Sequence, residues 1–266
     1  MRNTINMHKI KRLVKRFIEI LFVMMAIVIS YVLRLFKLKS CYICPICGYH
    51  GLFLSERPET GKRKHAKCPK CGLLERHRLQ YLVFKKVTEG INTQQMSMLH
   101  FAPEKYFSSI FKNQFKFYVT ADLNSTYVDK KEDLTRLSFK DNSFDFIFAS
   151  HVLEHIKEDG MALSEIKRVL KPNGIAIIPV PVIGKRTVEY PKPNPHEEFH
   201  VRCPGEDYYE RYSNYFSKVD CYKSTDFDEK YQLHVYEDRS GWPTSMPLRP
   251  SVCGKKHIDR VPVCVK

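Results

Sequence analysis

A strand, a helix and a second strand follow one another between residues 144 and 182, and this order restricts the possible folds more than any other feature. Phe144–Ala149 is nearly all apolar, as expected of a parallel strand that is buried on both faces. Apolar residues then recur at helical spacing, and Pro172–Gly174 ends that helix. Such βαβ units build open parallel sheets whose ligands bind at the carboxyl ends of the strands. We therefore predict an α/β protein.

Three polar residues fall at that edge of the predicted sheet. Ser150 and His151 follow the first strand, and Asp133 precedes the turn that leads into it. We expect them to lie where a cofactor would bind. In the alternative interpretation, Asp133 and His151 only cap a turn and the start of a helix.

The same region resembles the middle of a class I methyltransferase that depends on S-adenosylmethionine (SAM). The resemblance rests on DLTRLSFKDNSFDFIFASHVLEHI at 133–156, where a helix is expected to start near HVLEH, and on SEIKRVLKPNGIAIIPVPV at 164–182. It implies a SAM-dependent methyltransferase with a seven-stranded Rossmann-like sheet. The family's sheet ends in an antiparallel pair of strands, for which Lys218–Lys223 and Val261–Val265 are the candidates.

The resemblance also implies which residues contact the cofactor. Asp122 ends the predicted second strand and matches the carboxylate that accepts hydrogen bonds from both ribose hydroxyls. Asp133 and Leu134 match the position beside adenine. Ser150 and His151 match the loop near the methionine moiety.

The first loop departs from the family pattern. Ala102, Pro103 and Glu104 stand where most relatives carry a Gly-x-Gly turn, and the loop contains no glycine. Ala102 and Glu104 are the candidates for cofactor contact there. Together with LERHR at 74–78 and two CPxCG motifs, the loop resembles a subgroup of zinc-knuckle methyltransferase-like proteins over about residues 44–266. The missing glycine leaves open a noncatalytic protein on a methyltransferase scaffold.

A base is required if the methyl acceptor is a hydroxyl. His151 is the first candidate. His200 is the second, within Lys185–Gly205, a segment rich in proline, histidine and glutamate that we predict to be a loop over the substrate side. Glu206–Phe216 is predicted to be a helix. The alternative for each histidine is a structural role, which is the more common one in loops.

Two CxxC motifs predict a structural zinc site. Cys44-Pro-Ile-Cys47-Gly and Cys68-Pro-Lys-Cys71-Gly are separated by twenty residues, and together they supply four thiolates for tetrahedral zinc. Cys41 could replace Cys44, and a redox dithiol is the competing interpretation. The remaining cysteines lack such spacing and are predicted to be ordinary thiols: Cys203, Cys221, Cys253 and Cys264. Reduced ligand cysteines imply a reducing compartment.

The positive charge is concentrated in two N-terminal segments. The formal net charge is +15, of which residues 1–39 carry +8, residues 40–90 carry +6 and residues 91–266 carry +1. We predict a membrane-associating helix in the first segment, a zinc ribbon with a following helix in the second, and the methyltransferase domain in the third. The basic loop between the CxxC motifs, from Arg57 to Lys67, is either a solvated ribbon or a platform for an anionic partner.

The N-terminal segment joins basic residues to an apolar stretch. Its longest uncharged run, Ile20–Leu33, has fourteen residues, which is short of the roughly 20 needed to span a bilayer. Phe17–Phe36 reaches twenty only by including Glu19 and Arg34 near its ends. We therefore predict a helix that lies in or dips into the cytoplasmic leaflet, with its basic residues on anionic lipids. A single-pass anchor of inverted orientation and a helix packed on the protein are the alternatives.

These features favour a SAM-dependent methyltransferase that acts on a small-molecule or glycan-like acceptor at the cytoplasmic side of a membrane. The expected cofactors are SAM and structural Zn²⁺. The first alternative is an RNA methyltransferase whose zinc ribbon contacts RNA, since basic residues bind phosphates. The second alternative is the noncatalytic scaffold protein.

Overall fold

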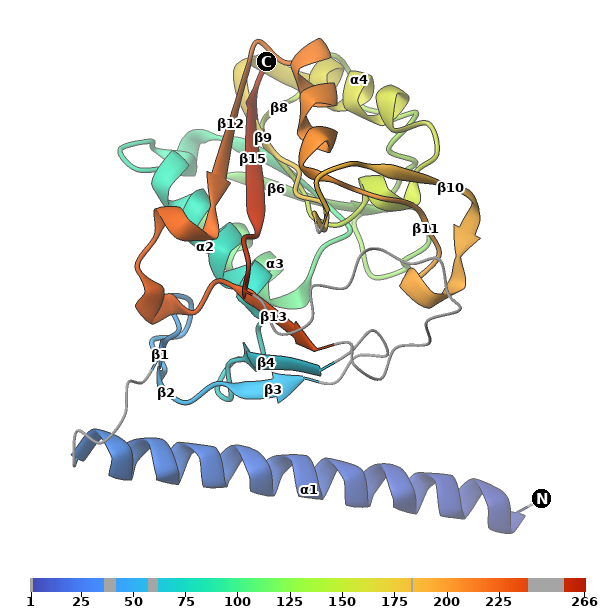
Figure 1. Cartoon of the computed structure of the whole chain (residues 1–266). Coiled ribbons are helices and arrows are strands. Elements are labelled where there is room, and N and C mark those ends of the chain that lie inside the picture. The colour runs from blue at the N-terminus through green and yellow to red at the C-terminus, as the bar shows by residue number, and fades with distance from the viewer. Residues whose placement is uncertain (1, 36–41, 57–61, 183, 239–255) are drawn as a thin grey trace.

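The computed structural model describes residues 2–35, 42–56, 62–182, 184–238 and 256–266. A seven-stranded sheet forms its centre (Figure 1). In spatial order, its strands are β12 (Lys218–Lys223), β15 (Arg260–Val265), β9 (Leu170–Ile177), β8 (Phe144–Ala149), β5 (Ser97–Phe101), β6 (Phe117–Asp122) and β7 (Lys130–Lys131). From β9 to β7 the neighbours are parallel, whereas β15 is antiparallel to both β9 and β12. The predicted α/β fold with its antiparallel terminal pair is confirmed.

Helices cover both faces of this sheet. They are α2 (Glu75–Val87) and α3 (Lys105–Gln114) on one face, and α4 (Asp159–Val169) with the 3₁₀ helix Glu206–Asn214 on the other. β8 supplies side chains to both layers, because successive residues of a strand point to opposite faces. Phe146 and Phe148 pack with α2 and α3, and Ile147 packs with α4. Aromatic rings dominate the first layer and place α3 against the sheet.

A smaller module lies at one end of the domain. Its strands are β1 (Tyr42–Ile43), β2 (His50–Gly51), β3 (Leu54–Glu56), β4 (Lys62–Lys67), β13 (Val235–Asp238) and β14 (Lys256–His257). β4 pairs with β3 on one side and with β13 on the other, so the module takes a strand from the distant C-terminal part of the chain. The fully buried Arg78 reinforces this junction, donating hydrogen bonds to the carbonyl oxygens of Ala66 at 2.9 Å and Gln232 at 2.6 Å.

α1 (Arg2–Leu35) is one helix of 34 residues that runs along the outside of the small module (Figure 1). This confirms the predicted N-terminal apolar helix. Its contact with the module centres on Ser30, whose Oγ accepts the backbone N–H of Leu52 at 2.8 Å and lies 3.0 Å from the hydroxyl of Tyr49. The approach is close, because a Cβ on Gly51 would come within 2.6 Å of the Cβ of Ser30.

The structure differs from the sequence-based expectation in the segment 185–205. Instead of a loop, it contains an antiparallel pair, β10 (Val188–Asn194) and β11 (His200–Cys203). Pro191 and Pro193 lack a backbone N–H, and proline is tolerated in a sheet only at its edges. The two prolines therefore argued against a strand in the sequence. This two-stranded sheet has free edges on both sides among the described residues, which accommodates them.

Two expected helices also differ in detail. Near HVLEH there is only one 3₁₀ turn, Leu153–His155, and α4 begins at Asp159. The expected helix over 206–216 is present as the 3₁₀ helix Glu206–Asn214. Tyr208 and Tyr212 are fully buried there. Tyr209, three residues before Tyr212, is also buried, since 3₁₀ periodicity brings side chains at i and i+3 into line. Burial of these aromatic rings stabilises the segment against the sheet.

Candidate active site

The predicted cofactor residues meet at the carboxyl edge of three neighbouring strands. Phe101, at the end of β5, lies opposite both Ala121 of β6 and Ala149 of β8. The residues that follow these positions are therefore level with one another. They are Ala102, Asp122 and Ser150. β5 is also the strand at which the order of the sheet reverses, and open α/β sheets bind ligands at such a point.

Two non-glycine residues at this edge have a left-handed backbone. Ala102, after β5, has φ +49°, and His151, after β8, has φ +55°. This conformation costs an L-residue about 1–2 kcal/mol and is found most often at functional sites. The first loop thus has the backbone conformation that favours glycine, although it contains none.

The two aspartates each use one carboxylate oxygen to shape their own loop. Asp122 Oδ1 accepts the backbone N–H groups of Asn124 and Ser125, both at 2.7 Å. Asp133 Oδ1 accepts the N–H and the hydroxyl of Thr135, both at 2.8 Å, so the capping interpretation holds for this oxygen. The second oxygen of each aspartate has no hydrogen bond to a described residue, and a ribose diol or an adenine amino group suits such acceptors. Leu134, beside Asp133, is buried in the core.

Glu104 lies between two buried histidines. Its carboxylate oxygens are 3.6 Å from His77 Nε2, on α2, and 3.8 Å from His100 Nε2, on β5. These distances are longer than hydrogen bonds. Burial raises the pKa of Glu104, but its interactions with His100 and His77 outweigh burial and hold the pKa well below its ordinary value. Glu104 is therefore a carboxylate that fixes the first loop to α2 and β5.

Ser150 is also attached to α2. Its Oγ donates a hydrogen bond to Oε1 of Gln80 at 3.2 Å, and both residues are buried. α2, the helix that follows the second CxxC motif, thus contacts two predicted cofactor residues. Gln80 bonds to Ser150, and His77 lies beside Glu104. α2 therefore links the small module to the strand ends at which the predicted cofactor residues lie.

His151 and His200 approach the same carboxylate. His151 Nδ1 lies 3.1 Å from Oε1 of Glu154, whose side chain has no solvent exposure. Burial raises the pKa of Glu154, but the hydrogen bond and charge of His151, with a contribution from His200, outweigh it and lower the pKa. Glu154 is therefore ionised. An ionised carboxylate only accepts hydrogen bonds, so Nδ1 of His151 is the donor in this contact.

The four predicted zinc ligands converge. Sγ of Cys44 lies 3.7 Å from Sγ of Cys71, and Sγ of Cys47 lies 3.6 Å from Sγ of Cys68. Zn–S bonds of about 2.3 Å in a tetrahedron separate the sulfurs by about 3.8 Å, so the cluster fits zinc. The alternative ligand Cys41 lies outside the described residues, as do Cys253 and Arg57.

Both CxxC turns have the same backbone geometry. The N–H of Gly48 donates to the carbonyl of Cys44 at 3.0 Å, and that of Gly72 donates to the carbonyl of Cys68 at 2.8 Å. The two glycines have φ +70° and +76°, which favours glycine. Four sulfurs on two equivalent turns match the geometry of a structural metal site.

Several residues of the site were missed from the sequence. Glu154, Gln80 and His77 are all buried, and their partners come from other segments or from a turn that was expected to be helical. His151 precedes the 3₁₀ turn Leu153–His155 and has a left-handed backbone, so its three-residue spacing from Glu154 gave no helical signal. The basic loop gave a misleading signal at Arg63, whose guanidinium is paired with the buried Glu75 at 2.5 Å.

Comparison with known proteins agrees with this geometry. Residues 93–178 match the family model of a methyltransferase domain, a range that contains β5, β6 and β8 with all the predicted SAM contacts. Curated proteins gave no match. Residues 93–178 therefore resemble a methyltransferase domain, and they lie within the seven-stranded sheet described above.

Solved structures of similar fold differ widely in sequence. Phosphoethanolamine N-methyltransferase 2 of Haemonchus contortus, in complex with S-adenosylhomocysteine, is 19% identical with a TM-score of 0.48, over 70% of this chain and 52% of its own. The cyclase SpnF is 19% identical with a TM-score of 0.43, over 56% and 62%. The YcgJ protein of Bacillus subtilis is 13% identical with a TM-score of 0.39, over 70% and 96%. This chain spans less than two thirds of the first two proteins.

Proposed function

We propose that the enzyme methylates a hydroxyl of a small-molecule or glycan-like acceptor at the cytoplasmic face of a membrane. The hydrogen bond between His151 and Glu154 carries this proposal. Methyl transfer requires the acceptor and the sulfonium to be aligned, and a hydroxyl acceptor also requires a base. Because Glu154 holds the Nδ1 proton, Nε2 of His151 is the atom that can accept the hydroxyl proton.

The residues at the strand ends fit SAM. SAM supplies the electrophilic methyl group, and the chain binds and orients it. The free oxygen of Asp122 would accept the ribose hydroxyls, and Asp133 with Leu134 would contact adenine. The left-handed backbone at Ala102 lets the first loop approach the ligand, and Glu104 holds that loop in place. Ser150 and His151 would face the methionine moiety.

The membrane part of the proposal rests on α1. Lys9–Leu33 is long and apolar enough to cross a membrane, with a mean hydropathy of 2.2, and only 6% of it is buried. The contact of Ser30 with Tyr49 and Leu52 places the C-terminal part of this helix against the small module. A helix that is fixed to the module on one side and apolar on the others suits the membrane interface.

A transfer experiment tests the acceptor class. The full-length protein is incubated with methyl-labelled SAM and separated membrane, soluble and RNA fractions of the cells that produce it. We expect label in a ribonuclease-resistant product of the membrane or small-molecule fraction. Label that is recovered only in ribonuclease-sensitive material would contradict the proposal and favour the RNA methyltransferase.

A further inference from the structure

A second cluster of metal-type ligands lies beside the proposed base. Glu154 and His155 belong to the turn after β8, and His200 begins β11, yet one potential ligand atom from each lies within 4.8 Å of the other two. The rings of His155 and His200 meet edge to face, with centroids 4.6 Å apart. The cluster adjoins His151 directly, because His151 bonds to Glu154.

One oxygen of the cluster lacks a partner. Oε1 of Glu154 is bonded to His151, whereas Oε2 is buried and has no hydrogen bond to any described residue. Burying an ionised oxygen without a partner is costly, and such atoms in native structures call for an explanation. A cation held between this oxygen and the two imidazoles would supply the missing partner.

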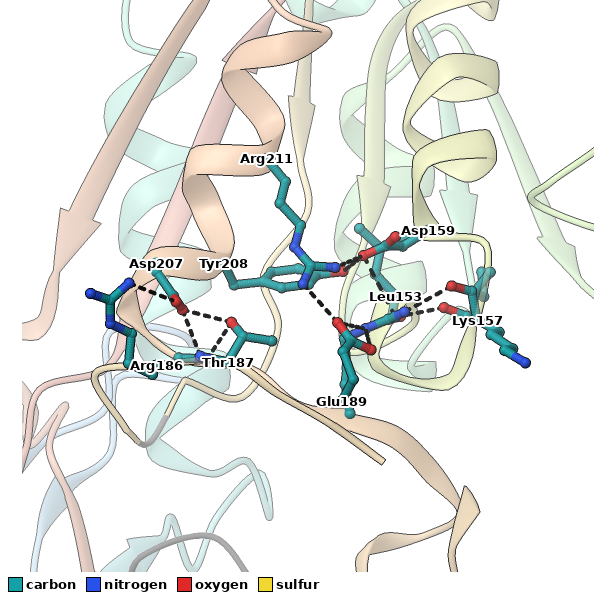
Figure 2. A network of polar contacts seen from close by, with 12 residues as sticks. Leu153, Lys157, Asp159, Arg186, Thr187, Glu189, Asp207, Tyr208 and Arg211 are labelled. Atoms are coloured by element: carbon teal, nitrogen blue, oxygen red, sulfur yellow. Dashed lines mark hydrogen bonds and ion pairs between the residues drawn. The ribbon is translucent and has the colours of Figure 1, made fainter. Parts of the chain in front are cut away.

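The two segments that carry the cluster are clamped together by Arg202. This side chain is 2% exposed, lies two residues after His200, and donates hydrogen bonds to the carbonyls of Leu153 at 2.7 Å and Lys157 at 2.8 Å. Asp159 and Glu189 balance its charge, and Figure 2 shows the network around these residues. Arg202 thus fixes the turn that bears Glu154 and His155 against β11, as the outer groups of a metal site do.

We propose that Glu154, His155 and His200 bind one divalent first-row transition cation. One carboxylate and two imidazoles select Zn²⁺, Mn²⁺, Fe²⁺ or Co²⁺ over Mg²⁺ and Ca²⁺, which prefer oxygen ligands alone. Ligand atoms approach such an ion to about 2.1 Å, and the exposed His155 can turn to close the set. Three protein ligands leave coordination positions open for an oxygen of the acceptor. This site is separate from the four cysteines.

The role of the cation rests on the proposed function. A hydroxyl bound to the cation loses its proton more easily, and Nε2 of His151 receives that proton. The hydroxyl oxygen then forms a bond to the methyl carbon while the carbon–sulfur bond breaks. The electron pair of that bond remains on sulfur. The products are the methyl ether and S-adenosylhomocysteine.

Cobalt titration of the zinc-loaded full-length protein tests the site. We expect one equivalent of Co²⁺ to bind with d–d absorption but without the thiolate-to-cobalt charge-transfer bands that a cysteine site would give. Glu154→Gln, His200→Ala and the exposed-position variant His155→Ala should each weaken cobalt binding by at least about tenfold to a hundredfold, the range for loss of a group that only supports a ligand. His196→Ala, which changes an exposed histidine of the same segment, should bind cobalt normally.

The outcomes separate this inference from the proposed function. If no cobalt binds outside the cysteine site, or if binding is unchanged in folded His155→Ala and His200→Ala, the metal site is refuted. The methyl transfer proposal can still stand in that case. If cobalt binds as expected but His151→Ala transfers methyl groups normally, the site is supported and the proposed base is refuted.

Discussion

The hydroxyl of Ser150, at the end of β8, donates a hydrogen bond to Oε1 of Gln80 in the middle of α2. Ser150 lies at the cofactor edge, whereas α2 starts four residues after Cys71, the last predicted zinc ligand. His77, on the same helix, contacts Glu104 of the first cofactor loop. α2 therefore joins the cysteine cluster to two loops that carry predicted SAM contacts, and we expect loss of zinc to reduce SAM binding.

Removal of zinc should reduce both stability and SAM affinity. Cys68→Ala should lose the bound zinc, because structural zinc contributes folding free energy directly and needs all four ligands. Elemental analysis and thermal unfolding measure the first effect, and calorimetry with SAM measures the second. Cys221→Ala, at a cysteine outside the cluster, should keep the zinc. Absence of zinc from freshly prepared reduced protein would show that this prediction is wrong.

Deletion of residues 1–39 should move the protein from the membrane fraction to the soluble fraction without abolishing methyl transfer. The deleted helix exposes apolar side chains such as Phe17, Phe22 and Met25, each more than half exposed, and makes no contact with the cofactor edge among the described residues. Fractionation of cell extracts checks the result. A full-length protein that is soluble without detergent would contradict it and favour a helix packed on the protein.

Gly51→Ala tests the contact between α1 and the small module. The added Cβ would lie within 2.6 Å of Ser30 Cβ, so the helix must move away. We expect faster proteolysis between α1 and the module with unchanged zinc content. Gly90→Ala is a matched control, since its Cβ would meet no atom within 4 Å, although its φ of +76° carries a local strain. Equal proteolysis of the two variants would refute a specific contact.

Acid should destabilise the protein partly through Glu104. The folded-state pKa of this carboxyl lies below its ordinary value of 4.5, so ionised Glu104 contributes stability above that value, and the contribution is lost as pH falls below it. Glu104→Gln should be less stable than the wild type near neutral pH, and its midpoint of thermal unfolding should fall less between about pH 6 and pH 3. Parallel midpoint curves for both proteins would contradict the assignment.

The parallel sheet could be predicted because its strands are continuous apolar runs with clear turn signals. Phe144–Ala149 is buried on both faces, so its sequence alone identifies it as an inner strand. The predicted zinc ligands could be identified equally well, since the two cysteines of each CxxC motif are close in sequence and the glycine after them indicates the turn. The inner strand and the cysteine motifs could both be predicted because each is defined by residues that are close together in the sequence.

The features that could not be predicted depend on contacts between distant segments. β13 pairs with β4 although more than half of the chain separates them in sequence, and no local sequence pattern predicts this pairing. Arg202 looks like a loop cation in the sequence but is buried among backbone carbonyls. Glu154 looks like a helix residue, yet it is the carboxylate that His151 and His200 approach. Burial of these charged groups is favourable only when the tertiary partners are present.

Substitution of His151 should affect chemistry more than binding. In single-turnover transfer to an identified acceptor, His151→Ala should slow methyl transfer by about a hundredfold or more, with SAM affinity nearly unchanged. His151→Gln retains a donor for Glu154 and should be equally slow if the imidazole acts as the base. A loss that is confined to SAM binding would instead make His151 a cofactor-loop residue. Normal rates in both variants would mean that alignment alone carries the reaction.

Calorimetric titration of the full-length protein with SAM tests the central claim most directly. We expect one SAM per chain, with affinity reduced by about 30- to 1000-fold in Asp122→Ala, because a carboxylate with two hydrogen bonds to a buried diol contributes about 2–4 kcal/mol. Asp220→Ala, at the opposite end of the sheet on β12, should bind SAM like the wild type. Absence of SAM binding to the zinc-loaded protein, or unchanged affinity in Asp122→Ala, would contradict the account.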